Sequence, residues 1–127
     1  MALARVLGEL KEGCTVVNSA RSHQWFSDEP IELNGLDLGP EPTELLLSSL
    51  VSCKLITLKM YAARKGWDIY GVEIHLEIVK NEEKTIVEKR FEFTDNLSEE
   101  QQERLRYISG KCPVAKMLSN SIEFKIV

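Results

Sequence analysis

The residues of this 127-residue chain with the most distinctive chemistry are three cysteines, Cys14, Cys53 and Cys112. The sequence has no glycine-rich phosphate loop, no GxSxG elbow, no CxxC pair and no HExxH motif. Its two histidines, His23 and His75, have no metal-binding partner at short spacing. The sequence therefore predicts no cofactor and no metal, with a zinc site assembled from distant cysteines and histidines as a minor alternative.

Cys112 has a local setting that favours a reactive thiol. It directly precedes Pro113, in the position of a helix cap, and Lys111 and Lys116 lie close to it in the sequence. Helix N-termini and neighbouring cations favour a thiolate over a thiol. An equally open interpretation is that Cys112 replaces Ser or Asp as a weak helix cap.

The local setting of Cys53 is less favourable, because it lies in the middle of a strongly apolar segment, residues 40–66. Such surroundings disfavour a thiolate, so the local pattern is typical of a buried core cysteine. A reactive Cys53 would need a cation and a base from elsewhere in the fold. Cys14 is predicted to be an ordinary strand residue.

Residues 40–66 predict one long central helix. Pro42 and Thr43 suit its start, Thr43 as a cap; Glu44 sits in the first turn, and Gly66 suits the position past the end. The predicted helix is apolar on nearly every side, which indicates cover by other elements or by a second subunit. In so short a chain this pattern favours an oligomer, most commonly a twofold dimer.

The rest of the chain predicts strands and shorter helices. Val72, Ile74, Leu76 and Ile78 alternate with mostly polar residues, as in a half-buried antiparallel strand. The order of segments predicts an α+β fold in one domain over residues 1–127, with an antiparallel sheet packed on the central helix. The expected elements are strands at 2–10, 14–19 and 23–27, a loop at 31–42, strands at 69–80 and 85–94, a helix capped by Ser98 and Gln101 that ends near Ser109, a short helix from Pro113, and a last strand at 121–127.

Charge and composition exclude several partners. The chain has 16 Lys+Arg against 20 Asp+Glu, with no basic stripe, which argues against nucleic acid and anionic membranes. Lys54 and Lys59 interrupt the apolar helix, so no membrane span is expected. The first residues lack a signal-peptide pattern, and the cysteines lack disulfide-framework spacing, so we expect a cytoplasmic protein.

Two motifs together resemble a known family. The run DEPIELNGLDLGPEPTELLLSSLVSCKLITLKMYAARKGWDI, followed by GKCPVAKML, is similar to the OsmC/Ohr proteins, the osmotically induced and organic-hydroperoxide-resistance proteins. The resemblance covers nearly the whole chain and looks closest to the short OsmC-like redox proteins. It implies an intertwined homodimer, with antiparallel sheets wrapped around two long central helices and a site at the subunit interface.

The resemblance also implies roles for individual residues. It makes Cys53 the peroxidatic thiol, which becomes a sulfenic acid, and Cys112 the resolving thiol, which forms a disulfide with it. In the family an Arg and a Glu hold the reactive thiolate. Arg21 is the best match for the Arg and Arg5 a weaker one. The family Glu falls at Thr43, and the adjacent Glu44 is the tentative substitute.

The sequence thus leads to three functional hypotheses. The preferred one is an enzyme, a thiol-dependent peroxidase for organic hydroperoxides that an external dithiol regenerates. The second is a binding protein for small molecules or acyl ligands that kept the fold and lost the chemistry. The third is a persulfide-handling or general thiol redox protein.

Overall fold

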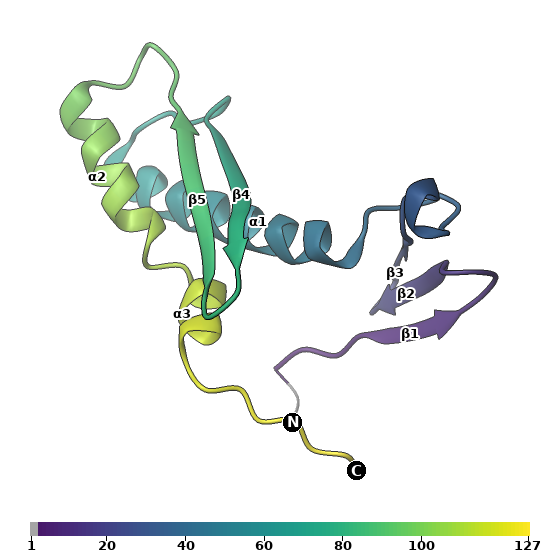
Figure 1. The fold of residues 1–127 in the computed structure, drawn as a ribbon. Coiled ribbons are helices and arrows are strands. Elements are labelled where there is room, and N and C mark those ends of the chain that lie inside the picture. The colour runs from purple at the N-terminus through teal and green to yellow at the C-terminus, as the bar shows by residue number, and fades with distance from the viewer. Residues whose placement is uncertain (1–2) are drawn as a thin grey trace. The chain divides into compact units, whose positions relative to one another are not determined.

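The computed structural model describes residues 3–127 and divides into two compact units, one up to Leu46 and one from Leu47 onward. Each is described by itself. The first contains an antiparallel sheet of β1 (Leu7–Leu10), β2 (Val16–Ala20) and β3 (His23–Ser27) in that order (Figure 1). The predicted strand at 23–27 is confirmed. The first strand begins later than predicted, at Leu7, and residue 2 lies outside the described part of the chain.

A buried carboxylate organises the loop that follows β3. Asp28 is 2% exposed. It accepts hydrogen bonds from the Thr15 hydroxyl at 2.7 Å and from the backbone N–H groups of Glu29, Leu36 and Leu38 at 2.8, 3.3 and 3.3 Å. The loop also contains a short 3-10 turn, η1 (Ile31–Leu33). Asp28 therefore fixes a segment that the sequence predicted only as an irregular loop.

The predicted long helix is confirmed as α1 (Pro42–Lys65), and Gly66 ends it with φ of 72°. The predicted cap is wrong. Thr43 lies inside the helix, and its hydroxyl donates to the Glu41 side chain at 3.4 Å. The side chain of Glu44 instead accepts a hydrogen bond from the Glu41 backbone N–H at 2.9 Å. Glu44 thus binds the backbone N–H of the residue that precedes the helix, and not one of the first helical N–H groups that Thr43 was expected to cap.

By length and composition alone, α1 is long and apolar enough to cross a membrane. Lys54 and Lys59 do not keep the helix from meeting this measure, and the expectation of no membrane span stays a prediction. The criterion carries little weight here, because the core helix of a folded domain passes it as well. One stripe of α1 is indeed buried: Leu50, Lys54, Leu58, Tyr61 and Ala62.

In the second unit, β4 (Glu73–Asn81) and β5 (Thr85–Glu92) form an antiparallel hairpin, with an irregularity in the pairing between Ile78 and Lys80. β4 starts at Glu73 and not at residue 69 as predicted. The reason is a turn in which the Val72 N–H donates to the Ile69 carbonyl at 3.1 Å, with Gly71 at φ of 93°. From Val72 onward the predicted alternation is confirmed, because the apolar side chains are buried or half-buried.

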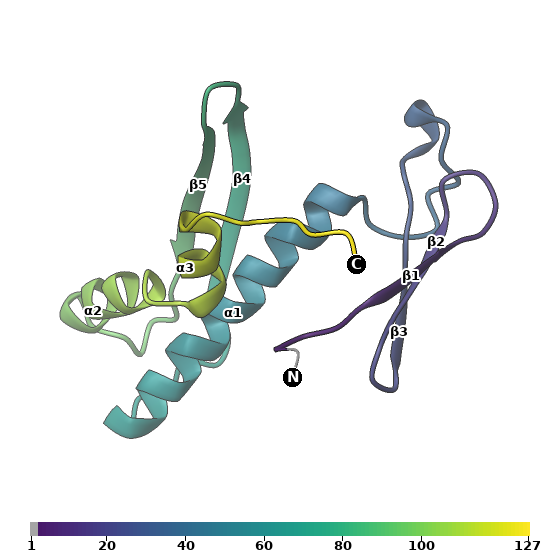
Figure 2. The same cartoon turned by 90° about the horizontal axis from the view of Figure 1, so that it is seen from below.

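Two helices complete the second unit (Figure 2). α2 (Glu99–Ser109) begins with the predicted capping box, in which Ser98 and Gln101 each bond the other's backbone N–H. α3 (Pro113–Ser119) begins at Pro113, as predicted. The hairpin and α2 pack on the buried stripe of α1. The core consists of Leu58, Tyr61, Ala62, Ile69, Val72, Ile74, Leu97 and Leu105.

The predicted last strand at 121–127 is wrong, since these residues form no regular element. Phe124 is 91% exposed, and no strand pairs with this segment within residues 3–127. Alternation marks a strand only where a neighbouring strand supplies hydrogen bonds, so the pattern alone is insufficient.

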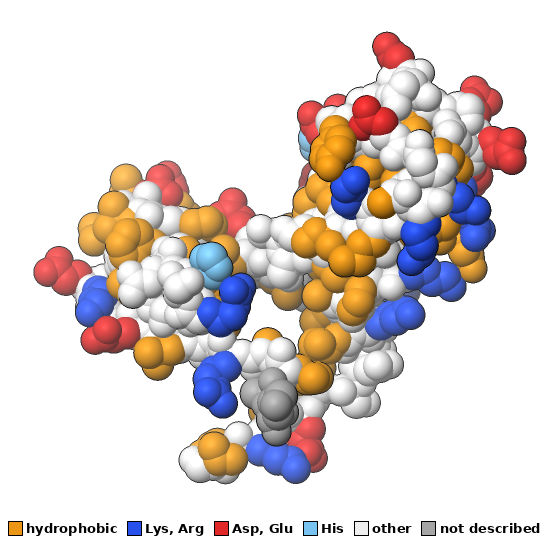
Figure 3. All heavy atoms as spheres, turned by 180° about the vertical axis from the view of Figure 1, so that it is seen from behind, with side chains coloured by type: hydrophobic (Ala, Val, Ile, Leu, Met, Phe, Trp, Pro, Cys, Tyr) orange, Lys and Arg blue, Asp and Glu red, His pale blue; other side chains and the backbone are white. Residues whose placement is uncertain are grey.

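Many large apolar side chains remain on the surface. On α1, Ile56 and Met60 are 55% and 63% exposed, on the side away from the buried stripe. Figure 3 shows hydrophobic side chains gathered on the exposed surface. A helix that is apolar all round but covered on one side leaves a surface suited to another apolar surface.

Candidate functional site

The structure places Cys112 at the point where α2 gives way to α3. Cys112 is the N-cap residue of α3, and its sulfur accepts a hydrogen bond from the Ala115 N–H at 3.4 Å. The predicted capping position is confirmed. The side chain is fully buried. A thiol in this position has a fixed orientation and is shielded from solvent.

The cation in contact with Cys112 is Lys54, which sequence reasoning missed. Its Nζ lies 3.8 Å from Cys112 Sγ and donates a hydrogen bond to the Ser109 carbonyl at 3.1 Å. The two lysines that the sequence predicted as the cations beside Cys112, Lys111 and Lys116, are placed differently. Lys111 has its Nζ 4.8 Å from the centre of the Tyr107 ring, and Lys116 is exposed in the last turn of α3.

A signal for Lys54 was present in the sequence. It occupies the same i, i+4 stripe as Leu50 and Leu58, which are both buried. A lysine in an apolar stripe at this spacing points toward the interior. The sequence analysis treated Lys54 only as an interruption of an apolar run.

A second lysine, Lys89, interacts electrostatically with Lys54 and Cys112. The pKa of Lys89, on β5, lies below its ordinary value, chiefly because of partial burial and also because the Lys54 charge opposes its protonation. The nearby Cys112 opposes this lowering of the Lys89 pKa. The surroundings of Cys112 are therefore positive, through Lys54 from α1 and Lys89 from β5.

Cys53 is half-buried on α1, directly before Lys54 in the chain. Its carbonyl accepts a hydrogen bond from the Thr57 hydroxyl at 2.8 Å. Within the second unit, residues 47–127, its sulfur makes no hydrogen bond. The C-terminal unit thus supports Cys112 electrostatically more than it supports Cys53, and the peroxidatic role of Cys53 stays a prediction.

The other predicted site residues belong to the first unit. Arg21 is exposed in the β2–β3 turn, with φ of 55°, and its approach to Cys53 stays a prediction. Glu44 is engaged at the start of α1. Cys14 is half-buried just before β2, not within a strand as predicted, with its sulfur 3.8 Å from the Asn34 carbonyl oxygen.

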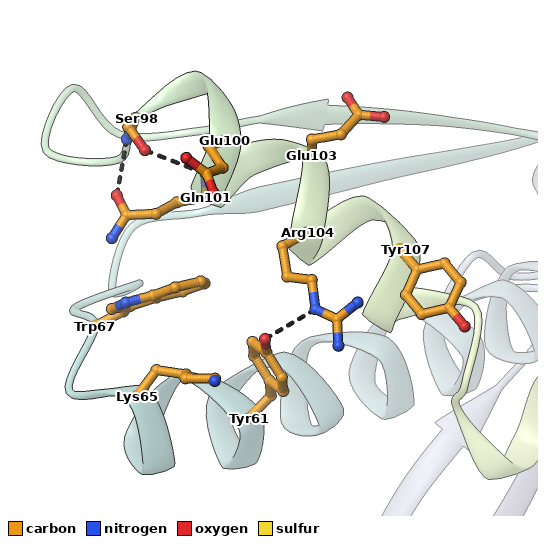
Figure 4. A pocket seen from close by; sticks show the side chains of 9 residues that line it. All are labelled: Tyr61, Lys65, Trp67, Ser98, Glu100, Gln101, Glu103, Arg104 and Tyr107. Atoms are coloured by element: carbon orange, nitrogen blue, oxygen red, sulfur yellow. Dashed lines mark hydrogen bonds between the residues drawn. The ribbon is translucent and has the colours of Figure 1, made fainter.

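An open hollow of about 800 Å³ lies between the end of α1 and α2 (Figure 4). Arg104 crosses it: its Nε donates to the Tyr61 hydroxyl at 2.9 Å, and its guanidinium lies over the Tyr61 and Tyr107 rings at 5.6 and 5.2 Å. The Arg104 guanidinium is thus already engaged by neighbouring side chains. None of the cysteines lines the hollow. The lining residues are Tyr61, Lys65, Trp67, Ser98, Glu100, Gln101, Glu103, Arg104 and Tyr107.

One group of potential metal ligands lies on the β4–β5 hairpin. Glu73, His75 and Glu92 are exposed, and each offers a ligand atom within 4.8 Å of the others. Arg90 already forms an ion pair with Glu92, and the His75 ring nitrogen lies 3.1 Å from Glu73. The group's charges are therefore engaged within the protein and exposed to water, which disfavours tight metal binding.

The model of the family described as OsmC-like protein matches residues 35–127, which contain both Cys53 and Cys112. A search of curated proteins found no match.

Three solved structures illustrate the likeness in fold. A candidate osmotic stress induced and detoxification response protein from Psychrobacter arcticus has a TM-score of 0.79 at 21% identity, over 92% of this chain and 89% of that one. An organic hydroperoxide resistance protein OsmC from Legionella pneumophila has 0.66 at 17%, over 93% and 91%. The organic hydroperoxide resistance protein OhrB of Bacillus subtilis has 0.63 at 16%, over 91% and 90%.

Proposed function

Because this chain belongs to the OsmC-like protein family, we propose that it is a thiol-dependent peroxidase that reduces organic hydroperoxides. The observation that carries the proposal is the pair of free thiols on the family-matched segment, with a lysine that immediately follows one thiol and contacts the other. Hydroperoxide resistance proteins are also among its structural neighbours.

The proposed cycle has three balanced steps. The Cys53 thiolate attacks the distal oxygen of the hydroperoxide, the O–O bond breaks, and a proton from solvent completes the departing alcohol. The Cys112 thiolate then attacks the sulfur of the Cys53 sulfenic acid; the S–S bond forms, and hydroxide leaves with a proton as water. An external dithiol reduces the disulfide and is itself oxidised. Arg21 and Glu44 are proposed to hold the Cys53 thiolate.

We propose that the working form is a cytoplasmic, intertwined homodimer that binds neither nucleic acid nor a membrane. The exposed apolar side of α1, with Ile56 and Met60, supports a second subunit at this helix. A partner subunit would also cover the half-buried Cys53. Sedimentation of the purified protein tests the dimer, and a monomer at all concentrations would contradict it.

The decisive experiment compares cumene hydroperoxide with hydrogen peroxide in stopped-flow assays with a dithiol reductant, followed by mass spectrometry of the cysteines. We expect faster consumption of the organic peroxide and a Cys53–Cys112 disulfide. Cys53→Ser should abolish consumption. With the dithiol omitted, Cys112→Ser should allow one turnover and leave a sulfenic acid. Cys14→Ser is the matched control with parental rates. Undiminished consumption by Cys53→Ser would refute the proposal.

The same samples address the alternatives. Slow peroxide consumption with sulfane sulfur on Cys53 after persulfide treatment would favour a persulfide-handling protein. Inert thiols with a co-purified small molecule would favour a binding protein.

A further inference from the structure

Lys54 is a charged side chain in an apolar setting. It is 4% exposed and occupies the stripe of α1 that also carries Leu50 and Leu58. An ammonium group removed from water is unfavourable unless anionic or polar groups replace the lost hydration. The contacts of Lys54 Nζ therefore indicate which group compensates its charge.

Within the second unit, residues 47–127, no carboxylate forms an ion pair with Lys54. Its Nζ has two contacts, the Ser109 carbonyl at 3.1 Å and Cys112 Sγ at 3.8 Å. A carbonyl carries only a partial charge. Of the two contacts, only the Cys112 sulfur can become a full anion.

The neighbouring elements of the second unit point to the same pair, Lys54 and Cys112. β5 contributes Lys89, whose lowered pKa reflects its burial and the repulsion of Lys54. The backbone of α3 contributes the Ala115 N–H to Cys112 Sγ. Lys111 is held over the Tyr107 ring. The two groups that contact this sulfur within the second unit, the Lys54 ammonium and the Ala115 N–H, are both donors, and both therefore favour negative charge on it.

We propose that Lys54 is a positioning residue that serves as the buried counter-ion of the Cys112 thiolate. In the proposed peroxidase cycle, on which this second role rests, the ammonium compensates negative charge on the Cys112 sulfur and orients it for its attack on the Cys53 sulfenic acid. When the disulfide forms, Cys112 loses its charge and Lys54 loses its counter-ion. The reduced state is therefore stabilised relative to the disulfide, which makes the disulfide more oxidising.

The first test needs no peroxidase activity. In a Cys14→Ser, Cys53→Ser background, Cys112 is the only thiol, and its ultraviolet thiolate absorbance is titrated in the full chain. Lys54→Gln removes the charge and keeps a donor for the Ser109 carbonyl, and Lys54→Met is a second neutral variant. We expect half-maximal absorbance at a pH about one unit higher in both.

Controls separate charge from structure. Lys54→Arg keeps the positive charge and should titrate like the parent. Lys59→Gln removes an exposed lysine of the same helix and should also leave the curve in place. Circular dichroism verifies that each variant is folded. A Lys54→Gln curve that superimposes on the parental curve would overturn the proposal.

The second test uses the chain with Cys53 restored. Redox titration against dithiol buffers should give a more negative midpoint potential for the Cys53–Cys112 disulfide in Lys54→Gln than in the parent. An unchanged potential contradicts the role in resolution. Failure of any disulfide to form would instead refute the proposed peroxidase cycle, while the thiolate titration still decides whether Lys54 is the counter-ion.

Discussion

Asp28 and Lys54 are buried charges, at 2% and 4% exposure, yet their surroundings differ. The Asp28 carboxylate accepts four hydrogen bonds, from Thr15 and from three backbone N–H groups. The hydrogen bond from Thr15 is the main reason that the pKa of Asp28 lies below its ordinary value, against the opposing effect of burial. Lys54 has one carbonyl and one sulfur.

The difference separates a charge that holds the backbone, Asp28, from a charge that acts on a reactive group, Lys54. A buried charge with a full set of hydrogen bonds fixes the backbone that supplies them. A buried charge with a single neutral acceptor is stabilised further by any neighbour that becomes negative. Asp28 accordingly organises a loop, and Lys54 favours a thiolate. This comparison leads to four tests, which combine variants of the two regions with fluorescence of Trp25 in the first unit and Trp67 in the second.

The largest loss of stability is expected from Gly35→Ala in the Asp28 loop. A Cβ at Gly35 would lie 1.8 Å from the Glu29 carbonyl oxygen, so the backbone must move. We expect the free energy of unfolding to fall by about 3 kcal/mol or more. Urea unfolding monitored by Trp25, in a Trp67→Phe background, measures it. Gly8→Ala is the control, since its Cβ would meet atoms only at 3.5 Å. Equal stability of the two variants would mean that this loop is not closely packed.

Asp28→Asn should be less harmful but still clearly destabilising. Each carboxylate oxygen accepts from a backbone N–H group, so either orientation of the amide places an NH₂ group against another donor. The Trp25 urea midpoint should fall, whereas the thiolate titration of Cys112 should not move. A shift of that titration would remove the distinction between the two regions.

The stability difference between the parent and Asp28→Asn should depend on pH in the acid range. Because folding lowers the pKa of Asp28 from 3.8, the unfolded chain takes up the proton first as the pH falls. The stabilisation is therefore fully present well above pH 3.8 and is lost as the pH falls below it toward the folded pKa. Urea midpoints of both proteins from neutral pH to pH 3 should converge only at the acid end. A constant difference would contradict the role of the charge.

The smallest effect on stability is expected from Lys54→Met. Methionine removes a buried charge together with its desolvation cost, which offsets the donor lost by the Ser109 carbonyl, so the free energy of unfolding should change by less than about 1 kcal/mol. Urea unfolding monitored by Trp67, in a Trp25→Phe background, checks this value. A large loss of stability would show that Lys54 holds the fold together in the way that Asp28 does.

Local sequence signals predicted much of the fold. The bounds of α1 were within two residues, the Ser98–Gln101 capping box was correct, and Pro113 does begin α3. These features depend on groups within one helical turn, so neighbouring residues suffice to predict them. The last strand failed for the opposite reason, since a strand needs partners from elsewhere in the chain.

The site was predicted only in part. Cys112 was placed correctly at a helix start, and the two thiols were recognised from motifs. Lys111 and Lys116 were expected to supply its positive charge because they are close in sequence. The structure supplies Lys54 instead, which is 58 residues away along the chain. Similarly, the donors to Asp28 come from 1 to 13 residues away, and no periodic pattern marks them.

The sequence by itself thus determined the long apolar helix, its end at Gly66, the capped helices and the presence of two family-matched thiols. Tertiary structure alone decided that the buried stripe of α1 places Lys54 against Cys112, and that a loop closes around Asp28. The physical reason is the range of the interactions. Caps and periodicity act within a turn or a strand, whereas compensation of a buried charge depends on which distant segments pack together.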